Sequence, residues 1–362
     1  MGQRERDICV GVPPVKFLWT RISNLRGICR QTATVERKDR VINGLIDEVV
    51  VTRGDVAAAA ERIAGAVERT PLIESEVAGV RIWFKCECLQ TGGAFKLRGA
   101  TNRLLRLSPE ERERGVVAFS SGNHARGVAI AAKRLGIQAI IVMPADAPKV
   151  KIEGTRAEGA EIVFYDRRTE SREEIAARIA GVSGATVVPS FDDPAIVAGQ
   201  GTVGLEIVEQ LGRSPARLVV PCGGGGLASG IALAVPDAEI VIVEPDNWDD
   251  MGRSLETGQI VQVATDAPNT FCDALQTPRV SQMTFGILRN RRAKALSVSD
   301  GEAAEAIRFA WEKHKLVVEP GGAVGLAALL SGKLAPAGGT VVVLSGGNVD
   351  PALHALIISE AT

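Results

Sequence analysis

The chain has 362 residues, a length that predicts about two domains. Hydrophobic residues make up 46% and charged residues 23%, which is typical of a soluble globular protein with a substantial core. The 42 Lys and Arg residues nearly balance the 43 Asp and Glu residues, which argues against a nucleic-acid partner. The sequence has no apolar run of about 18 residues, so we expect no membrane span.

Cysteine usage indicates a reducing compartment. The six cysteines are Cys9, Cys29, Cys86, Cys88, Cys222 and Cys272. None forms a C-x-x-C pair and the chain has three His, so the pattern does not predict a zinc site. Six thiols in a long chain fit a reducing cytosol better than a disulfide scaffold, and we therefore expect a cytoplasmic protein.

Residues 1–50 differ from the rest of the chain, being rich in Arg and poor in hydrophobic periodicity. We expect a poorly ordered extension without a catalytic role. An Arg-rich organellar presequence is an alternative, against which Glu5, Asp7 and Glu36 count. The compact fold is expected to begin near Thr52, which opens an Ala-rich helix.

From Thr52 onward, short apolar runs alternate with amphipathic stretches. The predicted strands are Arg81–Cys86, Val116–Phe119, Ala139–Met143, Ile162–Tyr165, Thr186–Pro189, Arg217–Pro221, Glu239–Glu244 and Thr340–Leu344. The predicted helices are Phe95–Leu107, His124–Leu135, Lys149–Glu158, Arg172–Ala180, Gly201–Leu211, Glu302–Lys315 and Gly322–Leu330. This alternation predicts an α/β protein with parallel sheets, in which ligands bind beyond the carboxyl ends of the strands.

Two segments combine small residues with reactive side chains at a predicted helix start. Leu89–Ala100 leads into a helix with Lys96 at its first turn, where the helix dipole favours the neutral amine that forms a Schiff base. Ser120–Ala125 follows a strand and brings hydroxyls, an amide and helix-start N–H groups together, which suits a carboxylate. The alternatives are a solvated lysine and an ordinary Ser/Asn helix cap.

Two further Gly-rich segments follow strands. Cys222–Ala228 contains four consecutive glycines, whose N–H groups can point into one concavity and bind a phosphate. Ser345–Asp350 follows the last predicted strand, so Ser345 would face the same crevice. The alternative for this last segment is a plain Gly-Gly turn.

Taken in order, these four segments resemble those of pyridoxal-phosphate (PLP) enzymes of fold type II, the tryptophan-synthase-β type. More narrowly, the chain resembles serine/threonine dehydratases and serine racemase, and the stretches Ile196–Thr202 and Val318–Ala323 extend the similarity. The resemblance implies two open, twisted, mostly parallel sheets with helices on both faces. It also implies a small domain, 109–193, inserted in a large PLP-binding domain formed by 51–108 and 194–362.

The resemblance further implies a cofactor site. Its residues would be Phe95, Lys96, Asn123, Gly223, Gly224, Gly225, Gly226, Leu227 and Ser345. Lys96 matches the lysine that carries PLP as a Schiff base, and Asn123 matches the side chain that contacts the ring 3′-oxygen. Ser345 matches the hydroxyl at the pyridine nitrogen, where a neutral group favours β-elimination over transamination.

The implied reaction is β-elimination of water from a 3-hydroxy amino acid of the threonine/serine type, giving a 2-oxo acid and ammonia. Lys96 would act as the general base, and Ser120, Ser121 and His124 would hold the substrate carboxylate. Ser121 also matches the opposite-face acid/base of a racemase, which leaves amino-acid racemisation as an alternative.

Two departures from the family pattern leave the substrate open. Ala94 stands where many relatives have Ser, and Phe271–Leu275 replaces a more usual Ala-Asp-Gly stretch. A modified substrate such as 3-hydroxyaspartate or hydroxyectoine is therefore a second alternative. The resemblance also suggests a homodimer.

An acidic loop predicts a metal site. Glu244 and Asp250 lie six residues apart, and with the Trp248 backbone oxygen they match the family pattern for Mg²⁺ or Ca²⁺. The alternative is a solvated acidic loop.

The glycine loop also has an alternative interpretation, as the dinucleotide-binding loop of a different class of enzyme. Gly223–Ala228 fits the fingerprint G-x-G-x-x-G/A, and Glu244 follows about 20 residues on, as in an NAD-dependent oxidoreductase. That interpretation leaves Lys96 and Ser345 without roles. A non-catalytic PLP- or amino-acid-binding protein is the remaining alternative.

Overall fold

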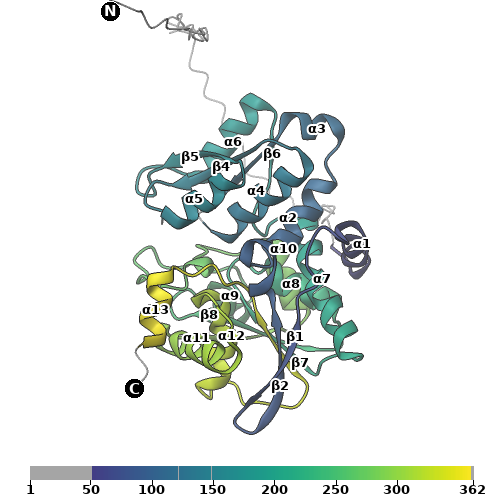
Figure 1. Cartoon of the computed structure of the whole chain (residues 1–362), viewed down its shortest axis with the longest axis vertical. Coiled ribbons are helices and arrows are strands. Elements are labelled where there is room, and N and C mark those ends of the chain that lie inside the picture. Colours follow the sequence, from purple (N-terminus) through teal and green to yellow (C-terminus); the bar gives the residue numbers. More distant parts are fainter. Residues whose placement is uncertain (1–50, 121, 148, 360–362) are drawn as a thin grey trace, which may run out of the picture. The chain divides into compact units, whose positions relative to one another are not determined.

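The computed structural model describes residues 51–120, 122–147 and 149–359, and its strands form two sheets (Figure 1). The larger sheet has the order β1-β2-β10-β7-β8-β9, with β1 (Leu72–Val77), β2 (Val80–Cys86), β7 (Arg217–Pro221), β8 (Glu239–Pro245), β9 (Lys294–Val298) and β10 (Thr340–Leu344). The smaller sheet has the order β5-β4-β3-β6, with β3 (Val116–Phe119), β4 (Ala139–Pro144), β5 (Glu161–Tyr165) and β6 (Thr186–Val187). Every pairing is parallel except β1 with β2. The predicted α/β fold with two mostly parallel sheets is confirmed.

Helices connect these strands. They are α1 (Arg53–Ile63), α2 (Lys96–Leu105), α3 (Pro109–Arg114), α4 (Asn123–Leu135), α5 (Lys149–Ala157), α6 (Arg172–Ser183), α7 (Pro194–Leu211), α8 (Gly226–Ala234), α9 (Asp250–Thr257), α10 (Gln282–Asn290), α11 (Asp300–His314), α12 (Pro320–Leu330) and α13 (Pro351–Ser359). Short 3₁₀ turns are η1 (Glu87–Leu89), η2 (Thr91–Gly93) and η3 (Asp273–Leu275). Among the described residues, no helix combines the length and the apolar character that crossing a membrane would require.

The smaller sheet is buried on both faces. Successive side chains of a strand point to opposite faces, and here Val116 and Ala118 pack in the cluster that contains α4, whereas Val117 packs in the cluster that contains Ile175 and Ala176 of α6. Helices therefore cover both faces, as Figure 1 shows for α4 and α6.

The larger sheet follows the same rule. Val341 and Val343 of β10 pack in the cluster formed with α1, α7 and α8, and their neighbours Val342 and Leu344 pack with α11 and α12. Strands that are apolar on both faces are expected in parallel sheets covered by helices.

The strands of the smaller sheet all lie between β2 and β7 in the sequence. The larger sheet thus takes its strands from both sides of a continuous segment, an arrangement that fits an inserted domain. The boundaries 51–108, 109–193 and 194–362 stay a prediction, and residues 1–50 lie outside the described residues.

The prediction missed strands β1 and β9 and helices α3, α9, α10 and α13, and it placed the start of α7 too late. Strands β1 and β9 were not expected, because β1 carries three polar residues and β9 is only partly buried. Helix α7 begins at Pro194 instead of Gly201. Gly199, in the early part of α7, allows close packing, since a Cβ on it would lie 2.6 Å from the Gly99 Cα.

A buried ion cluster joins α2 to its neighbours. The Arg98 guanidinium is fully buried, with Nε 2.8 Å from Glu87 Oε2 and Nη1 2.5 Å from Glu206 Oε1. Lys85 Nζ lies 2.5 Å from the other Glu206 oxygen. Two cations and two carboxylates compensate each other, and this satisfies the requirement for paired charges in a protein interior.

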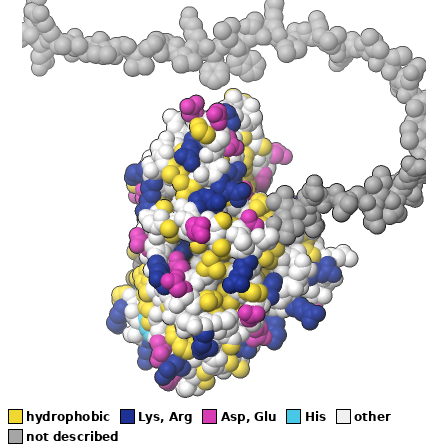
Figure 2. All heavy atoms as spheres, turned by 90° about the vertical axis from the view of Figure 1, so that its right-hand side faces the viewer, with side chains coloured by type: hydrophobic (Ala, Val, Ile, Leu, Met, Phe, Trp, Pro, Cys, Tyr) yellow, Lys and Arg dark blue, Asp and Glu magenta, His cyan; other side chains and the backbone are white. Residues whose placement is uncertain are grey.

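The surface carries both signs of charge. Figure 2 shows basic and acidic side chains interspersed with hydrophobic ones on the face that it draws, in keeping with the near balance of the composition. The cysteines of the described part, Cys86, Cys88, Cys222 and Cys272, are buried free thiols.

Candidate active site

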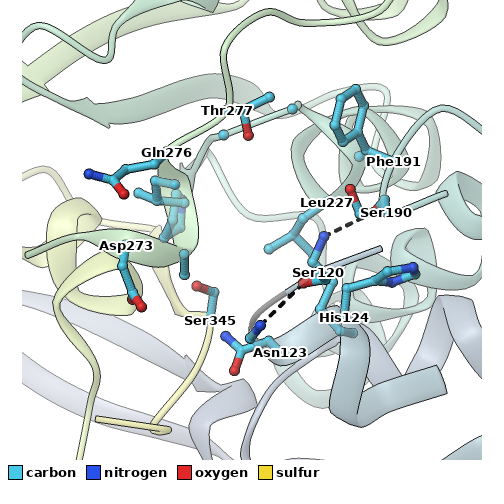
Figure 3. Close-up of a pocket in the computed structure, with 18 of the residues that line it drawn as sticks. Ser120, Asn123, His124, Ser190, Phe191, Leu227, Asp273, Gln276, Thr277 and Ser345 are labelled. Atoms are coloured by element: carbon cyan, nitrogen blue, oxygen red, sulfur yellow. Dashed lines mark hydrogen bonds between the residues drawn. The ribbon is translucent and has the colours of Figure 1, made fainter. Parts of the chain in front are cut away.

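A pocket opens at the carboxyl ends of three strands, because it is lined by Phe119 and Pro221, the last residues of β3 and β7, and by Ser345, which follows β10. Its empty space is about 1250 Å³, counting the part that opens to solvent. The predicted site residues that line it are Phe95, Lys96, Ser120, Asn123, His124, Gly223, Gly224, Gly225, Gly226, Leu227 and Ser345. Figure 3 shows several of them around one hollow. Ser121 lies outside the described residues.

Lys96 is the first residue of α2, as the sequence predicted for a lysine at a helix start. Its Nζ donates a hydrogen bond to the Ser190 carbonyl oxygen at 2.9 Å and lies 5.1 Å from the centre of the Phe95 ring. Burial lowers the pKa of Lys96 to about 8, although the charge of Glu319 acts in the opposite direction. With this pKa, about half of the amine is neutral at pH 8 and about a tenth at pH 7, and the neutral form is the one that acts as nucleophile and base.

The glycine loop is enclosed on several sides. A Cβ on Gly224 would lie 2.2 Å from the Phe191 ring, and a Cβ on Gly226 would lie 3.0 Å from the Phe191 Cβ. Gly225 has a φ of +83° and precedes the first residue of α8, so the loop ends at a helix N-terminus. Such a terminus presents free N–H groups to an anion. This cradle shares one pocket with Lys96, and these residues fit PLP.

The start of α4 borders the same pocket (Figure 3). The Ser120 hydroxyl accepts a hydrogen bond from the Gly122 N–H at 3.2 Å. His124 is buried, and its Nε2 lies 2.9 Å from the Val188 carbonyl oxygen. Burial and the Lys96 charge lower the pKa of His124 to about 3, so the imidazole is neutral. The carboxylate-binding role predicted for this turn would therefore depend on Ser120 and helix N–H groups rather than on a charged His124.

Glu319 was not predicted as a site residue, although the stretch that contains it was recognised. It lines the pocket, it is 3% exposed, and its Oε1 accepts a hydrogen bond from Asn123 Nδ2 at 2.5 Å. Burial, together with the charge of Asp273, raises the pKa of Glu319 to about 7. An acidic residue directly before a Pro-initiated helix was the available signal, but nothing in the sequence linked it to Asn123.

Basic side chains lie along another part of the pocket. Lys151, Arg167 and Arg172 all line it. Lys151 of α5 forms an ion pair with Asp273 of η3. Arg172, the first residue of α6, lies 5.5 Å from the centre of the Phe119 ring. No motif linked Lys151 to the two arginines, because Lys151 lies between β4 and β5, whereas Arg167 and Arg172 lie between β5 and β6.

The predicted metal ligands lie outside this pocket, at the end of β8 and the start of α9. Glu244 and Asp250 are fully buried, and neither Asp250 carboxylate oxygen has a hydrogen-bond partner among the described residues. Burial, reinforced by Asp250, raises the pKa of Glu244, and burial raises the pKa of Asp250 to about 7. Two buried carboxylates, one of them with both oxygens unpartnered among the described residues, suit a hard cation, so these residues would fit Mg²⁺ or Ca²⁺.

The Glu244 environment argues against the dinucleotide interpretation. Its two carboxylate oxygens accept hydrogen bonds from the backbone N–H groups of Met251, at 3.0 Å, and Gly252, at 2.8 Å. A carboxylate held by a helix start in this way is not presented to a ribose hydroxyl.

Known proteins are similar to most of this chain. Residues 63–346 match the family described as "Pyridoxal-phosphate dependent enzyme". The L-threo-3-hydroxyaspartate ammonia-lyase of Pseudomonas sp. is 46% identical over 313 residues, which are 84% of this chain and 97% of that protein. The protein of the same name from Saccharomyces cerevisiae is 43% identical over 320 residues, 86% of this chain and 97% of its own length.

A solved structure shows the same fold. The structure of maize serine racemase has a TM-score of 0.80 and 36% sequence identity, and the match covers 86% of this chain and 98% of that chain. The match to the family extends over more than half of the chain, and it includes Lys96 and the glycine loop. The chain therefore belongs to the pyridoxal-phosphate dependent enzymes of fold type II, in the group that contains lyases and racemases.

Proposed function

We propose that this enzyme is an ammonia-lyase that eliminates water from 3-hydroxyaspartate, giving a 2-oxo dicarboxylic acid and ammonia. Two curated relatives of that name, at 46% and 43% identity, support this substrate. Because of these two relatives, the alternative substrate 3-hydroxyaspartate has more support than the threonine or serine of the main prediction. A 3-hydroxyaspartate carries a second carboxylate where threonine carries a methyl group, so the pocket must compensate one more negative charge.

Each role in the site falls to a residue of the pocket. When bound, PLP supplies the electron sink for bond breaking at the amino-acid α-carbon. Lys96 would hold it covalently, and the N–H groups at the start of α8 would bind its phosphate. Lys96, with a pKa near 8, is suited to take the Cα proton. Ser345 offers a neutral hydroxyl, and Ser120 with the α4 N-terminus would bind the α-carboxylate.

The observation that carries the substrate proposal is the group of cations on the pocket wall. Lys151 is matched by its ion pair with Asp273, whereas Arg172 packs over Phe119 and pairs through Nε with Glu173, a neighbour whose side chain is 55% exposed. An exposed pair of this kind contributes little and exchanges readily. Arg167 likewise pairs with an exposed partner, Asp146, but its own side chain is 47% exposed against 33% for Arg172. We therefore assign the second carboxylate to the more buried Arg172, through the two-pronged geometry of a guanidinium.

Exchange of this arginine tests the proposal. Arg172→Met should raise KM for L-threo-3-hydroxyaspartate by about 100-fold, the value of a charged hydrogen-bonded contact, and change KM for L-serine by less than about threefold. Arg178→Met, at an exposed position of the same helix, is the matched control. Ammonia release measured on both substrates decides between the outcomes. A wild-type enzyme that prefers serine or threonine would contradict the proposal.

Racemisation is a second candidate, favoured by the similarity to maize serine racemase. Ser121 would be the acid/base on the face opposite Lys96. Incubation of the enzyme with L-serine and chiral chromatography of the remaining amino acid separate the two activities, since a pure lyase leaves no D-serine.

The acidic site at the end of β8 completes the proposal. Glu244, Asp250 and the Trp248 carbonyl oxygen would hold Mg²⁺ or Ca²⁺. A Cβ on Gly225 would lie 2.7 Å from the Met251 side chain, so α9 packs directly on the glycine loop. A cation at this place would act as a structural support for the phosphate cradle rather than as a participant in the chemistry.

A further inference from the structure

A chain of side-chain hydrogen bonds runs behind the pocket, from Arg126 on α4 to Glu319. Arg126 Nη1 donates to Asn348 Oδ1 at 2.9 Å. Asn348 Nδ2 donates to the Gly92 carbonyl oxygen and to Asn123 Oδ1, both at 2.8 Å. Asn123 Nδ2 donates to Glu319 Oε1 at 2.5 Å. Four side chains from three distant parts of the sequence therefore form one continuous relay.

The relay has only one direction. A guanidinium has donors and no acceptor, so the Asn348 oxygen must face Arg126 and its NH₂ group must face away. Both Nδ2 hydrogens of Asn348 then have acceptors, and the Asn123 oxygen is fixed toward Asn348. Reversal of the Asn123 amide would set its oxygen against the Glu319 carboxylate and its NH₂ group against that of Asn348. Arg126 thereby fixes the direction of two amides.

This direction decides what Asn123 offers to the pocket. An NH₂ group has two hydrogens, and Glu319 uses one of them. The second hydrogen of this NH₂ group is therefore free to bond to an acceptor in the pocket that Asn123 lines. An Asn123 in the opposite orientation would offer an acceptor at this place.

Asn348 also ties together the loops that carry the site. A Cβ on Gly93 would lie 2.3 Å from Asn348 Oδ1, so the loop before Lys96 packs against the Asn348 amide. The Gly347 N–H donates to the Gly93 carbonyl oxygen at 2.8 Å, next to an isolated bridge between Ala94 and Gly346. The Lys96 loop, the Asn123 turn and the Ser345 loop thus meet at one side chain.

We propose that Asn348 and Arg126 are positioning residues that fix the Asn123 amide so that it presents a donor to the 3′-oxygen of bound PLP. This inference rests on the proposed placement of the cofactor. Asn348 itself does not line the pocket, so it acts through Asn123 and not by contact with the cofactor.

The test compares holoenzymes of three variants. Asn348→Asp has nearly the same shape, but both of its oxygens are acceptors, so it cannot donate to Asn123. It should weaken PLP binding about tenfold, measured as loss of the visible cofactor band on dilution, and shift that band in the direction produced by Asn123→Ala. Asn290→Asp, at the exposed end of α10, is the matched control and should leave both readouts unchanged.

Two variants of Arg126 keep the inference testable if Asn348→Asp does not fold. Arg126→Met removes the donor that directs Asn348 and should shift the band in the same direction, with about a threefold loss of PLP affinity, whereas Arg126→Lys keeps a donor and should restore the wild-type spectrum. If Asn348→Asp does not fold, the Arg126 pair decides by the same readouts. Folded variants with the wild-type band and affinity would overturn the inference and leave the proposed function intact. A wild-type protein that carries no PLP would instead overturn the proposed function.

Discussion

Protonation of the Glu319 carboxyl group makes the stability of the fold depend on pH. Its pKa is raised from an ordinary value of 4.5 to about 7 because it is buried and lies near Asp273. A raised folded-state pKa means that the folded protein binds the proton more tightly than the unfolded chain does. The stability from this proton is fully present below pH 4.5 and is lost as the pH rises through 7.

Glu319→Gln should therefore remove a pH-dependent loss of stability in the apoenzyme. We expect the free energy of unfolding of the variant, relative to the wild type, to increase by roughly 3 kcal/mol between pH 4.5 and 8. Glutamine keeps an oxygen that can accept from Asn123. Urea denaturation at several pH values measures the difference, with Glu312→Gln at an exposed site of α11 as control. A difference that stays constant with pH would contradict the assignment.

At the same scale, the sequence predicted the residues that come in recognisable motifs. Lys96, Asn123, Ser345 and the glycines at 223–226 all line one pocket. The contacts that orient them could not be predicted, since the hydrogen bond from Arg126 to Asn348 joins residues 222 positions apart. Such a contact depends on how the two sheets pack, which no local pattern encodes.

Close helix packing explains the glycines in the interiors of α7 and α8. A Cβ on Gly230 of α8 would lie 2.4 Å from the Val197 carbonyl oxygen and 2.5 Å from the Gly201 nitrogen, both of them backbone atoms of α7. Backbone atoms cannot move aside as a flexible side chain can, so the two helices would have to separate.

Gly230→Ala should accordingly destabilise the protein by about 3 kcal/mol, the cost of overpacking. Gly181 of α6 offers a matched control, because a Cβ there would have no neighbour within 4 Å in the part of the chain that the structure describes. Gly181→Ala should be neutral or stabilising by about 1 kcal/mol, since alanine favours a helix. Thermal denaturation of both variants gives the comparison, and equal effects would show that packing is not the reason for Gly230.

Elements with a strong local signal were predicted well. Strands Val116–Phe119, Arg217–Pro221 and Thr340–Leu344 have the expected bounds, because each is a continuous apolar run closed by a turn. The edge strands β1 and β9 were missed because a strand at the edge of a sheet has a neighbour on one side only and tolerates polar residues, which weakens its apolar pattern.

For the molecule as a whole, the buried carboxylates Glu244 and Asp250 are an unfavourable pair without a cation. Ca²⁺ or Mg²⁺ should raise the melting temperature by roughly 5 °C at saturating concentration, because it binds the folded state alone. Asp250→Asn should raise the melting temperature in EDTA, since it removes an unpartnered charge, and should abolish the response to metal. Asp237→Asn, at an exposed site, should respond as the wild type does. A wild type insensitive to both metals would refute the site.

Some expectations at this scale stay predictions, among them the homodimer and the domain boundaries. Composition and strand–helix alternation were enough to predict the α/β class, because they reflect burial averaged over many residues. They cannot set the contacts between subunits, which depend on a few side chains of one surface.

The ion cluster around Arg98 bears on how this enzyme loses activity on heating. Arg98 stands two positions after Lys96 on the same helix, and its guanidinium is bound to Glu87 and Glu206 in the interior. The helix that carries the reactive amine is therefore anchored in the core, and local unfolding there would expose the four charged groups of the cluster to solvent. We therefore expect Lys96 to lose its position in the active site only when the core itself unfolds, so that thermal inactivation and unfolding of the core coincide.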